Sequence, residues 1–325
     1  MNKHRILSAL GIVATAVGLF LLYRVLRRYD FTEVANAVAS APLWTVALTA
    51  IFTIGSYAAM ATMEWLAVRY TRQHVTPRRI AKTAVAALGI GHSIGLVALS
   101  SGAVRYRMYQ RAGLSPLAVG EIVLFSGLTV GLGLASVGGI ALLWRGGDIL
   151  SEPLGIPQGL IDAIGWAALA GVVGYVAVCA FAPRVWRFWS FYFRLPSFGT
   201  ACGQALAGTM NLACVSGALY AALKGFTVVD YPTAATLYVG SDVSALIGHV
   251  PGGWGVFEYI VTEALDDPNV IAGVVVFRAV YFLAPLAIGL VLFVIDEVTG
   301  RRAPVGGKKR DKNGKKKRSV SAQAA

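Results

Sequence analysis

Charged residues are scarce in this sequence of 325 residues: Asp, Glu, Lys and Arg make up 14%, whereas apolar residues make up 56%. A soluble domain typically carries about 25% charged residues, so a water-exposed surface is excluded for most of this chain. Several apolar stretches reach the roughly 20 residues needed to cross a hydrocarbon core, and none shows the alternating pattern of barrel strands. The composition therefore predicts an all-α polytopic integral membrane protein.

Cysteine and enzymatic motifs are also scarce or absent. Cys179, Cys202 and Cys214 stand singly in apolar runs without CxxC spacing, which favours packing residues over a disulfide framework or a zinc site. The sequence contains no GxxxxGK[ST], HExxH or GxSxG motif and no metal-spaced His/Asp cluster. We therefore expect no metal, no cofactor and no soluble catalytic domain, and the chain is not predicted to be an enzyme.

Six uninterrupted apolar spans are predicted to cross the membrane. They cover residues 6–26, 43–68, 117–143, 160–182, 198–223 and 270–298. The first resembles a signal peptide, but its apolar run exceeds the roughly 7 to 15 residues of such a peptide, so we interpret it as an uncleaved helix. Residues 1–298 are thus predicted to form a single transmembrane domain.

The remaining residues, 299–325, form a polar tail that holds ten of the 29 basic residues. Such a composition cannot form a core and is predicted to be disordered. No folded nucleic-acid-binding module accompanies it, so the expected partner is anionic lipid and not nucleic acid.

Two further apolar segments, residues 80–103 and 231–265, are interrupted by polar residues, glycine and proline. Basic residues collect in cytoplasmic loops. If each segment returns to the side from which it entered, most basic residues fall on the cytoplasmic side together with both termini. This pattern favours six crossings plus two re-entrant hairpins that enter from opposite sides. Eight transmembrane helices are the alternative.

The first interruption reads ALSSGAVRYRMYQRAGLS, residues 98–115. Ser100, Ser101 and Gly102 are residue types that begin helices, which predicts a short helix over residues 103–112 that ends at Gly113. The arginines of this segment would then lie in the first turns of the helix.

Those arginines predict a site for an anion. The positive end of the helix dipole disfavours cations by about 0.3–1 kcal/mol, and Arg107 and Arg111 form a like-charge pair one turn apart. A lipid phosphate would relieve both conflicts. The predicted lipid head-group residues are Ser101, Arg105, Arg107, Tyr109 and Arg111. A basic interfacial helix without a ligand is the alternative.

The second interruption reads HVPGGWGVFE, residues 249–258. Proline ends the preceding helix, the glycines let the chain turn, and a new helix is predicted to start around Gly255 with Glu258 in its first turn. Glu258 is thus a helix-start carboxylate, an ion-pair partner or a proton-coupling group. The predicted gate or coupling residues are His249, Pro251, Gly252, Gly253, Gly255, Glu258, Arg278 and Tyr281.

Arg278 lies in the middle of the last span. An unpaired arginine there costs about 2.5–3.5 kcal/mol on insertion scales, so a buried carboxylate should face it. Besides Glu258, the candidate buried partners are Glu64, Glu121 and Asp242, with His92 as a further buried polar residue near the first interruption. For His92 and His249 a structural hydrogen bond is favoured over proton transfer.

Four stretches together resemble a known family. ALSSGAVRYRMYQRAGLS, HVPGGWGVFE, VVVFRAVYFLAPLAIG and MEWLAVRY are similar to the membrane region of the bacterial lysylphosphatidylglycerol synthetase/flippase family and its stand-alone membrane relatives. The similarity covers about residues 5–298. The matching positions are Arg105, Arg107, Pro251, Gly252, Gly253, Gly255, Glu258, Arg278, Tyr281 and Pro285, and Glu64 stands where aspartate is common.

This resemblance implies a flippase-type domain that moves an anionic or modified phospholipid or glycolipid between the leaflets of the bacterial cytoplasmic membrane. The soluble aminoacyl-transferase domain of the synthetases has no counterpart here, which argues against lipid synthesis. The alternative is a non-transporting accessory subunit or scaffold for a lipid-modifying enzyme. The lipid substrate, the direction and energy source of transport and the oligomeric state, a homodimer included, stay open.

Overall fold

The computed structural model describes residues 31–94, 97–151, 155–183, 185–188, 191–248, 253–267 and 269–299. The predicted span at residues 6–26 and the basic tail beyond residue 299 lie outside the described residues. The described chain is helical apart from two short antiparallel strands, β1 (Val185–Phe188) and β2 (Phe191–Arg194).

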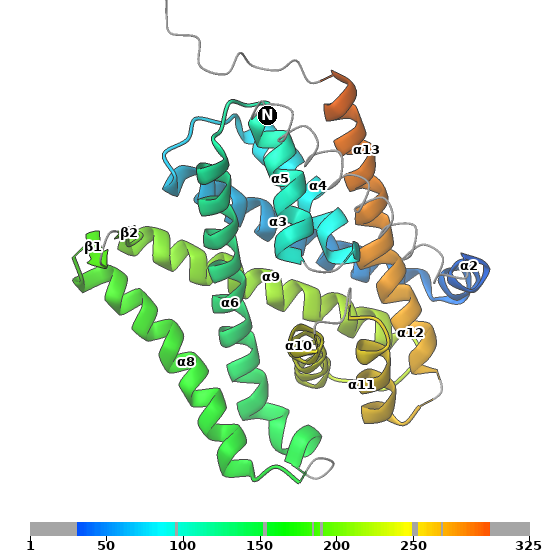
Figure 1. The fold of residues 1–325 in the computed structure, drawn as a ribbon. Coiled ribbons are helices and arrows are strands. Elements are labelled where there is room, and N and C mark those ends of the chain that lie inside the picture. Colours follow the sequence, from blue (N-terminus) through cyan, green and yellow to red (C-terminus); the bar gives the residue numbers. More distant parts are fainter. Residues whose placement is uncertain are drawn as a thin grey trace, which may run out of the picture.

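Five helical segments of the described chain are long and apolar enough to cross a membrane (Figure 1). Their helices are α3 (Leu43–Tyr70), α6 (Pro116–Gly146) followed by the π-helix η1 (Gly147–Ser151), α8 (Gln158–Phe181), α9 (Phe198–Lys224), and the continuous run of α12 (Val270–Phe277), η3 (Arg278–Leu283) and α13 (Ala284–Thr299). They coincide with five of the six predicted spans, and the protein is an all-α polytopic membrane protein. A shorter helix, α2 (Phe31–Ser40), precedes them.

Side-chain caps explain where several helices begin. The Ser115 hydroxyl accepts a hydrogen bond from an amide in the first turn of α6, and Ser197 does the same for α9. Asp230 caps α10 (Tyr231–Ile247) in the same way, with Pro232 in the first turn. Each cap satisfies an amide that has no partner within its helix.

The helix α9 lies at the centre of the bundle. Within the most apolar 18-residue stretch of each helix, 67% of α9 is buried inside the protein. Only 11% of that stretch is buried in α8, which lies at the edge (Figure 1). Small residues let α9 approach α6 closely: a Cβ placed on Gly133 would lie 2.3 Å from the carbonyl oxygen of Gly208. The backbones of α6 and α9 therefore touch, as in other membrane helix pairs built on small residues.

The first interrupted segment forms a hairpin of α4 (Pro77–Ile94) and α5 (Val97–Gln110). At its open end, Arg79 Nη2 donates to the carbonyl of Met108 at 2.9 Å. Near its turn, a Cβ placed on Gly91 would lie 2.8 Å from the Cβ of Ser101. The chain therefore returns to the end of the bundle from which it came. We call this pair the first hairpin.

The second interrupted segment forms a hairpin of α10 and α11 (Val256–Leu265), the second hairpin. At its open end, Thr227 before α10 lies close to the Asp267 carboxylate after α11 and lowers its pKa. Near its turn, a Cβ placed on Gly253 would lie 3.4 Å from the Cβ of Ala245. Three predicted gate residues in the turn, His249, Pro251 and Gly252, lie outside the described residues.

The two hairpins enter from opposite ends of the bundle. Tyr70, at the end of α3, donates to the backbone carbonyl of Arg194 just before α9, and Thr45, at the start of α3, contacts Gly225 at the end of α9. The helices α3 and α9 are therefore antiparallel. Because the first hairpin follows α3 and the second follows α9, they lie toward opposite ends (Figure 1). The predicted opposed hairpins agree with this arrangement better than eight plain helices.

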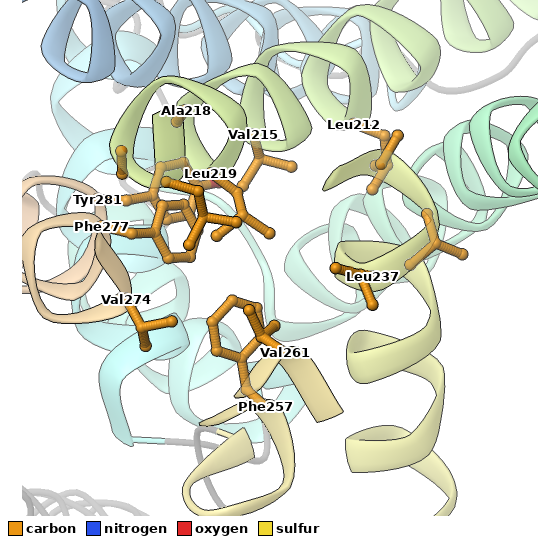
Figure 2. Close-up of a cluster of buried hydrophobic side chains, with 14 of the residues drawn as sticks. Leu212, Val215, Ala218, Leu219, Leu237, Phe257, Val261, Val274, Phe277 and Tyr281 are labelled. Carbon is orange, nitrogen blue, oxygen red and sulfur yellow. The ribbon is translucent and has the colours of Figure 1, made fainter. Parts of the chain in front are cut away.

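A cluster of apolar side chains seats the second hairpin. Leu237 of α10 and Phe257 and Val261 of α11 pack with Leu219 of α9 and Phe277 of α12 (Figure 2). Between membrane helices such packing stabilises through van der Waals contact, because lipid is as apolar as these side chains. This packing places the start of α11 beside η3, the π-helix that begins at Arg278.

Candidate functional site

The first hairpin is tied to α3 by a buried ion pair. Arg105 Nε lies 3.0 and 2.9 Å from the two oxygens of Glu64, and Arg105 Nη2 lies 2.9 Å from Glu64 Oε2. The two side chains are only 3% and 1% exposed. Tyr109 donates its hydroxyl to Glu64 at 3.0 Å, and Arg105 Nη1 donates to Ser101 Oγ at 2.7 Å. A buried pair needs such additional hydrogen bonds to offset its desolvation.

Helix periodicity explains this arrangement on α5. Ser101, Arg105 and Tyr109 follow one another at intervals of four residues, which places them on one face of the helix. That face meets α3 at Glu64, which sequence reasoning offered as a partner for Arg278 and not for Arg105. The spacing signals the stripe on α5, whereas the choice of carboxylate depends on the packing of α5 on α3.

The other two predicted head-group arginines contact the end of α13. Arg107 Nη2 lies 2.8 Å from Glu297 Oε1, and Arg111 Nη1 lies 3.1 Å from Asp296 Oδ2. Arg79 of α4 adds a contact of 3.5 Å to Asp296 Oδ1. Carboxylates thus occupy the places in which the sequence predicted an anion.

The predicted start of the α5 helix is wrong. The helix begins at Val97, so Ser101 is not its cap, and the Ser101 side chain instead contacts Arg105. Arg107 consequently lies in the last turn, and Arg111 directly follows the helix. The helix dipole favours cations at that end, so the expected conflict between the dipole and the arginines does not arise.

The second hairpin is tied to η3 by a second ion pair, which confirms the predicted need of Arg278 for a carboxylate. Arg278 Nε and Nη2 lie 2.9 and 2.8 Å from Glu258 Oε1. The other oxygen, Oε2, accepts the backbone N–H of Gly255 at 2.8 Å and so caps α11. Glu258 is therefore a helix-start carboxylate and an ion-pair partner at once. The φ of +83° at Gly255 suits glycine.

Aromatic rings surround the Arg278 guanidinium. Its central carbon lies 4.4 Å from the ring centre of Trp254, 5.0 Å from Phe257 and 4.9 Å from Phe282. Such cation–π contacts are worth about 0.5–2 kcal/mol each. Arg278 opens the π-helix η3, and Pro285 stands just after it. The proline cannot donate a hydrogen bond to the helix ladder, and π-turns of this kind are frequent at functional sites.

Tyr281, the next predicted gate residue, belongs to a polar contact between three helices. Its hydroxyl lies 3.0 Å from Ser56 Oγ, which donates to Asn211 Oδ1 at 2.7 Å. Its ring stacks on Phe277 at 5.3 Å. Tyr281 thus ties η3 to α3 and α9. Sequence reasoning missed Ser56 and Asn211, because single polar residues in apolar spans form no motif.

The other candidate partners do not meet Arg278. Arg278 pairs with Glu258, and neither Glu121 nor Asp242 forms an ion pair with it. His92 Nδ1 is buried and has no hydrogen-bond partner within the described ranges, so the expected structural bond at that atom is not found. No group of three or more His, Cys, Asp or Glu side chains in this part of the chain could hold a metal ion.

The two ion pairs have opposite polarity. In the first hairpin the arginine is on the hairpin and the carboxylate on the spanning helix α3. In the second the carboxylate is on the hairpin and the arginine on the spanning run. The anionic member therefore lies on the spanning helix in one pair and on the hairpin in the other.

Comparison with known proteins finds two relatives with similar sequences. The uncharacterized protein slr0712 of Synechocystis is 26% identical over 237 residues, which is 71% of this chain and 73% of that protein. The inner membrane protein YbhN of Escherichia coli is 28% identical over 205 residues, or 61% of this chain and 64% of YbhN. No protein-family model matches the chain. Together with the five apolar helices, these relatives indicate that the chain is a membrane protein.

Proposed function

We propose that this protein is a lipid translocase, which moves an anionic or modified phospholipid or glycolipid between the leaflets of the cytoplasmic membrane. One observation carries the proposal: two hairpins enter the bundle from opposite ends, and each is tied to a spanning helix by an arginine–carboxylate pair. Helices that end inside a membrane are tolerated only against protein or a watery cavity, and they build the binding sites of many transporters. The resemblance to the flippase family supports the same activity.

In this proposal the lipid phosphate enters by exchanging with carboxylates on arginine. Phosphate and carboxylate bind the same guanidinium fork. Arg107 pairs with Glu297, and its side chain is 41% exposed, so it is the accessible first contact. Arg111 lies beside it. Arg105, with Ser101 and Tyr109, forms the buried end of this region and holds the hairpin in place. The Glu258–Arg278 pair forms the gate on the second hairpin.

In the proposed function the protein moves lipid without altering it, so it would act neither as an enzyme nor with a cofactor. Its partners are membrane lipids, and its basic tail lies on anionic lipid at the cytoplasmic face with both termini inside. The location in a bacterial inner membrane rests on the relative named for that membrane.

Transport in reconstituted vesicles tests the proposal. Purified protein is inserted into vesicles that contain fluorescent phosphatidylglycerol, and dithionite reports the label left in the outer leaflet. Wild type should exchange the lipid, while Arg105→Lys and Arg278→Lys should slow exchange by about tenfold, since a bidentate fork is lost. Arg78→Gln, which removes an exposed arginine on α4, serves as the control. Exchange by wild type no faster than in protein-free vesicles would rule out the translocase.

The alternatives predict other outcomes of the same preparation. A non-transporting accessory subunit would copurify with a lipid-modifying enzyme and show no exchange by itself. An enzyme would return lipid with a changed head group.

Sidedness has a separate test. Single cysteines at positions 106 and 267, in a background without the native cysteines, should react with an impermeant thiol reagent from the cytoplasmic and the outer side, respectively. Reaction of both from one side would contradict the proposed orientation.

A further inference from the structure

The geometry around Arg278 points to a second phosphate-binding site: we propose that a lipid phosphate replaces the Glu258 carboxylate on Arg278, so that the second hairpin has its own lipid site. This inference rests on the proposed function and extends it, because a translocase must hold its lipid at both ends of the path. The first hairpin offers arginines at one end of the bundle, and Arg278 offers one beside the hairpin that enters from the other.

The guanidinium of Arg278 is incompletely used by Glu258. Its Nε and Nη2 both donate to one oxygen, Oε1, because Oε2 is taken by the cap on Gly255. Nη2 also lies 3.5 Å from the carbonyl oxygen of Gly253. A phosphate diester presents two oxygens to the same two donors, so each donor would receive an anionic oxygen of its own. The diester carries one negative charge, as the carboxylate does, so the guanidinium keeps an anionic partner after the exchange.

The arginine would keep its place without Glu258. The rings of Trp254, Phe257 and Phe282 lie within 4.4–5.0 Å of its guanidinium, and its side chain is only 4% exposed. These contacts attract the cation whichever anion is bound. The site is therefore organised before the ligand arrives.

The carboxylate, in contrast, is the accessible member of the pair. Glu258 is 33% exposed, and its side chain can turn away from Arg278 while the helix stays seated by Phe257 and Val261. Released from Arg278, Glu258 can still cap Gly255, so α11 does not lose its start.

The pair of the first hairpin lacks these properties. Glu64 uses both of its oxygens on Arg105, receives a third hydrogen bond from Tyr109, and is 1% exposed on a spanning helix. Its exchange would leave a buried carboxylate without a partner, which is costly. Of these two pairs, only the one at Arg278 is thus suited to exchange.

Tryptophan fluorescence tests this site without any transport. Trp254 lies on Arg278 and reports a brominated lipid by quenching. The protein is placed in phosphatidylcholine nanodiscs with increasing brominated phosphatidylglycerol or brominated phosphatidylcholine, and the signal of a Trp254→Phe background is subtracted for each variant. Brominated phosphatidylglycerol should quench wild type at a lower mole fraction than brominated phosphatidylcholine does.

The matched variants separate the charge of Glu258 from its cap. Glu258→Gln retains an oxygen that accepts the Gly255 N–H but removes the competing charge, so half-quenching should occur at about tenfold less phosphatidylglycerol. Arg278→Gln should abolish the preference for phosphatidylglycerol. Glu263→Gln, an exposed change on the same helix, should leave the curve unchanged. Far-UV circular dichroism verifies that each variant is folded.

The outcomes are distinct. Equal quenching by both lipids in wild type, or no gain in Glu258→Gln, would overturn the second site. Competition by millimolar inorganic phosphate would show a site for free phosphate instead of a lipid head group and would also overturn it. If the lipid preference is found but the vesicles show no exchange, the site stands and the translocase fails; exchange without the preference gives the reverse.

Discussion

Replacing Glu64 with glutamine should destabilise the protein by about 3–5 kcal/mol, the cost of removing one member of a buried ion pair. The magnitude follows from the burial of the pair. Arg105 is 3% exposed, and its Nε and Nη2 both donate to Glu64, so the change leaves an uncompensated charge. At about 1.4 kcal/mol per factor of ten, the unfolding equilibrium shifts by roughly a hundred- to several-thousand-fold. This is a large part of a typical stability of about 5–15 kcal/mol.

Equilibrium unfolding in mixed micelles, with increasing dodecyl sulfate and detection by circular dichroism, measures this loss. The double variant Glu64→Met/Arg105→Met should recover most of it, because removal of both charges also removes their desolvation cost. Arg107→Gln, on the same helix as Arg105, is the control. Its pair with Glu297 is about 40% exposed on both sides, so the loss should stay below about 1 kcal/mol and shrink with added salt. Equal losses for Glu64→Gln and Arg107→Gln would refute the reasoning from burial.

Two further perturbations test other parts of the fold. Gly133→Ala should separate α6 from α9 and cost about 1–3 kcal/mol in the same assay, since its Cβ would meet the Gly208 carbonyl at 2.3 Å, whereas Gly131→Ala, with open space around it, should be tolerated. Hydrogen bonds from Thr233 hold the pKa of the Asp230 carboxyl at about 2, below its usual range. The stability it contributes is therefore present above about pH 4 and lost as the pH falls toward 2. Asp230→Asn should flatten the acid limb of an unfolding curve, and an unchanged limb would contradict this assignment.

The sequence by itself determined the class of the protein and the position of its breaks. A chain with scarce charge and long apolar runs must lie in a membrane. It forms helices there because an exposed backbone cannot be satisfied in lipid. Proline and glycine act locally, so the break before Gly255 and the start of α11 were predictable. The cost of a lone arginine in a span likewise required a carboxylate for Arg278.

Only the tertiary structure decided which groups meet. Four carboxylates were candidates for Arg278, and Glu258 is its partner because the second hairpin packs against η3. Glu64 instead belongs to Arg105, from a helix 41 positions away in the chain. The same contact explains the error at α5, where Ser101 binds Arg105 and does not cap the helix. Local preferences set helix starts and breaks, but pairing between buried charges depends on how helices pack, which no local pattern contains.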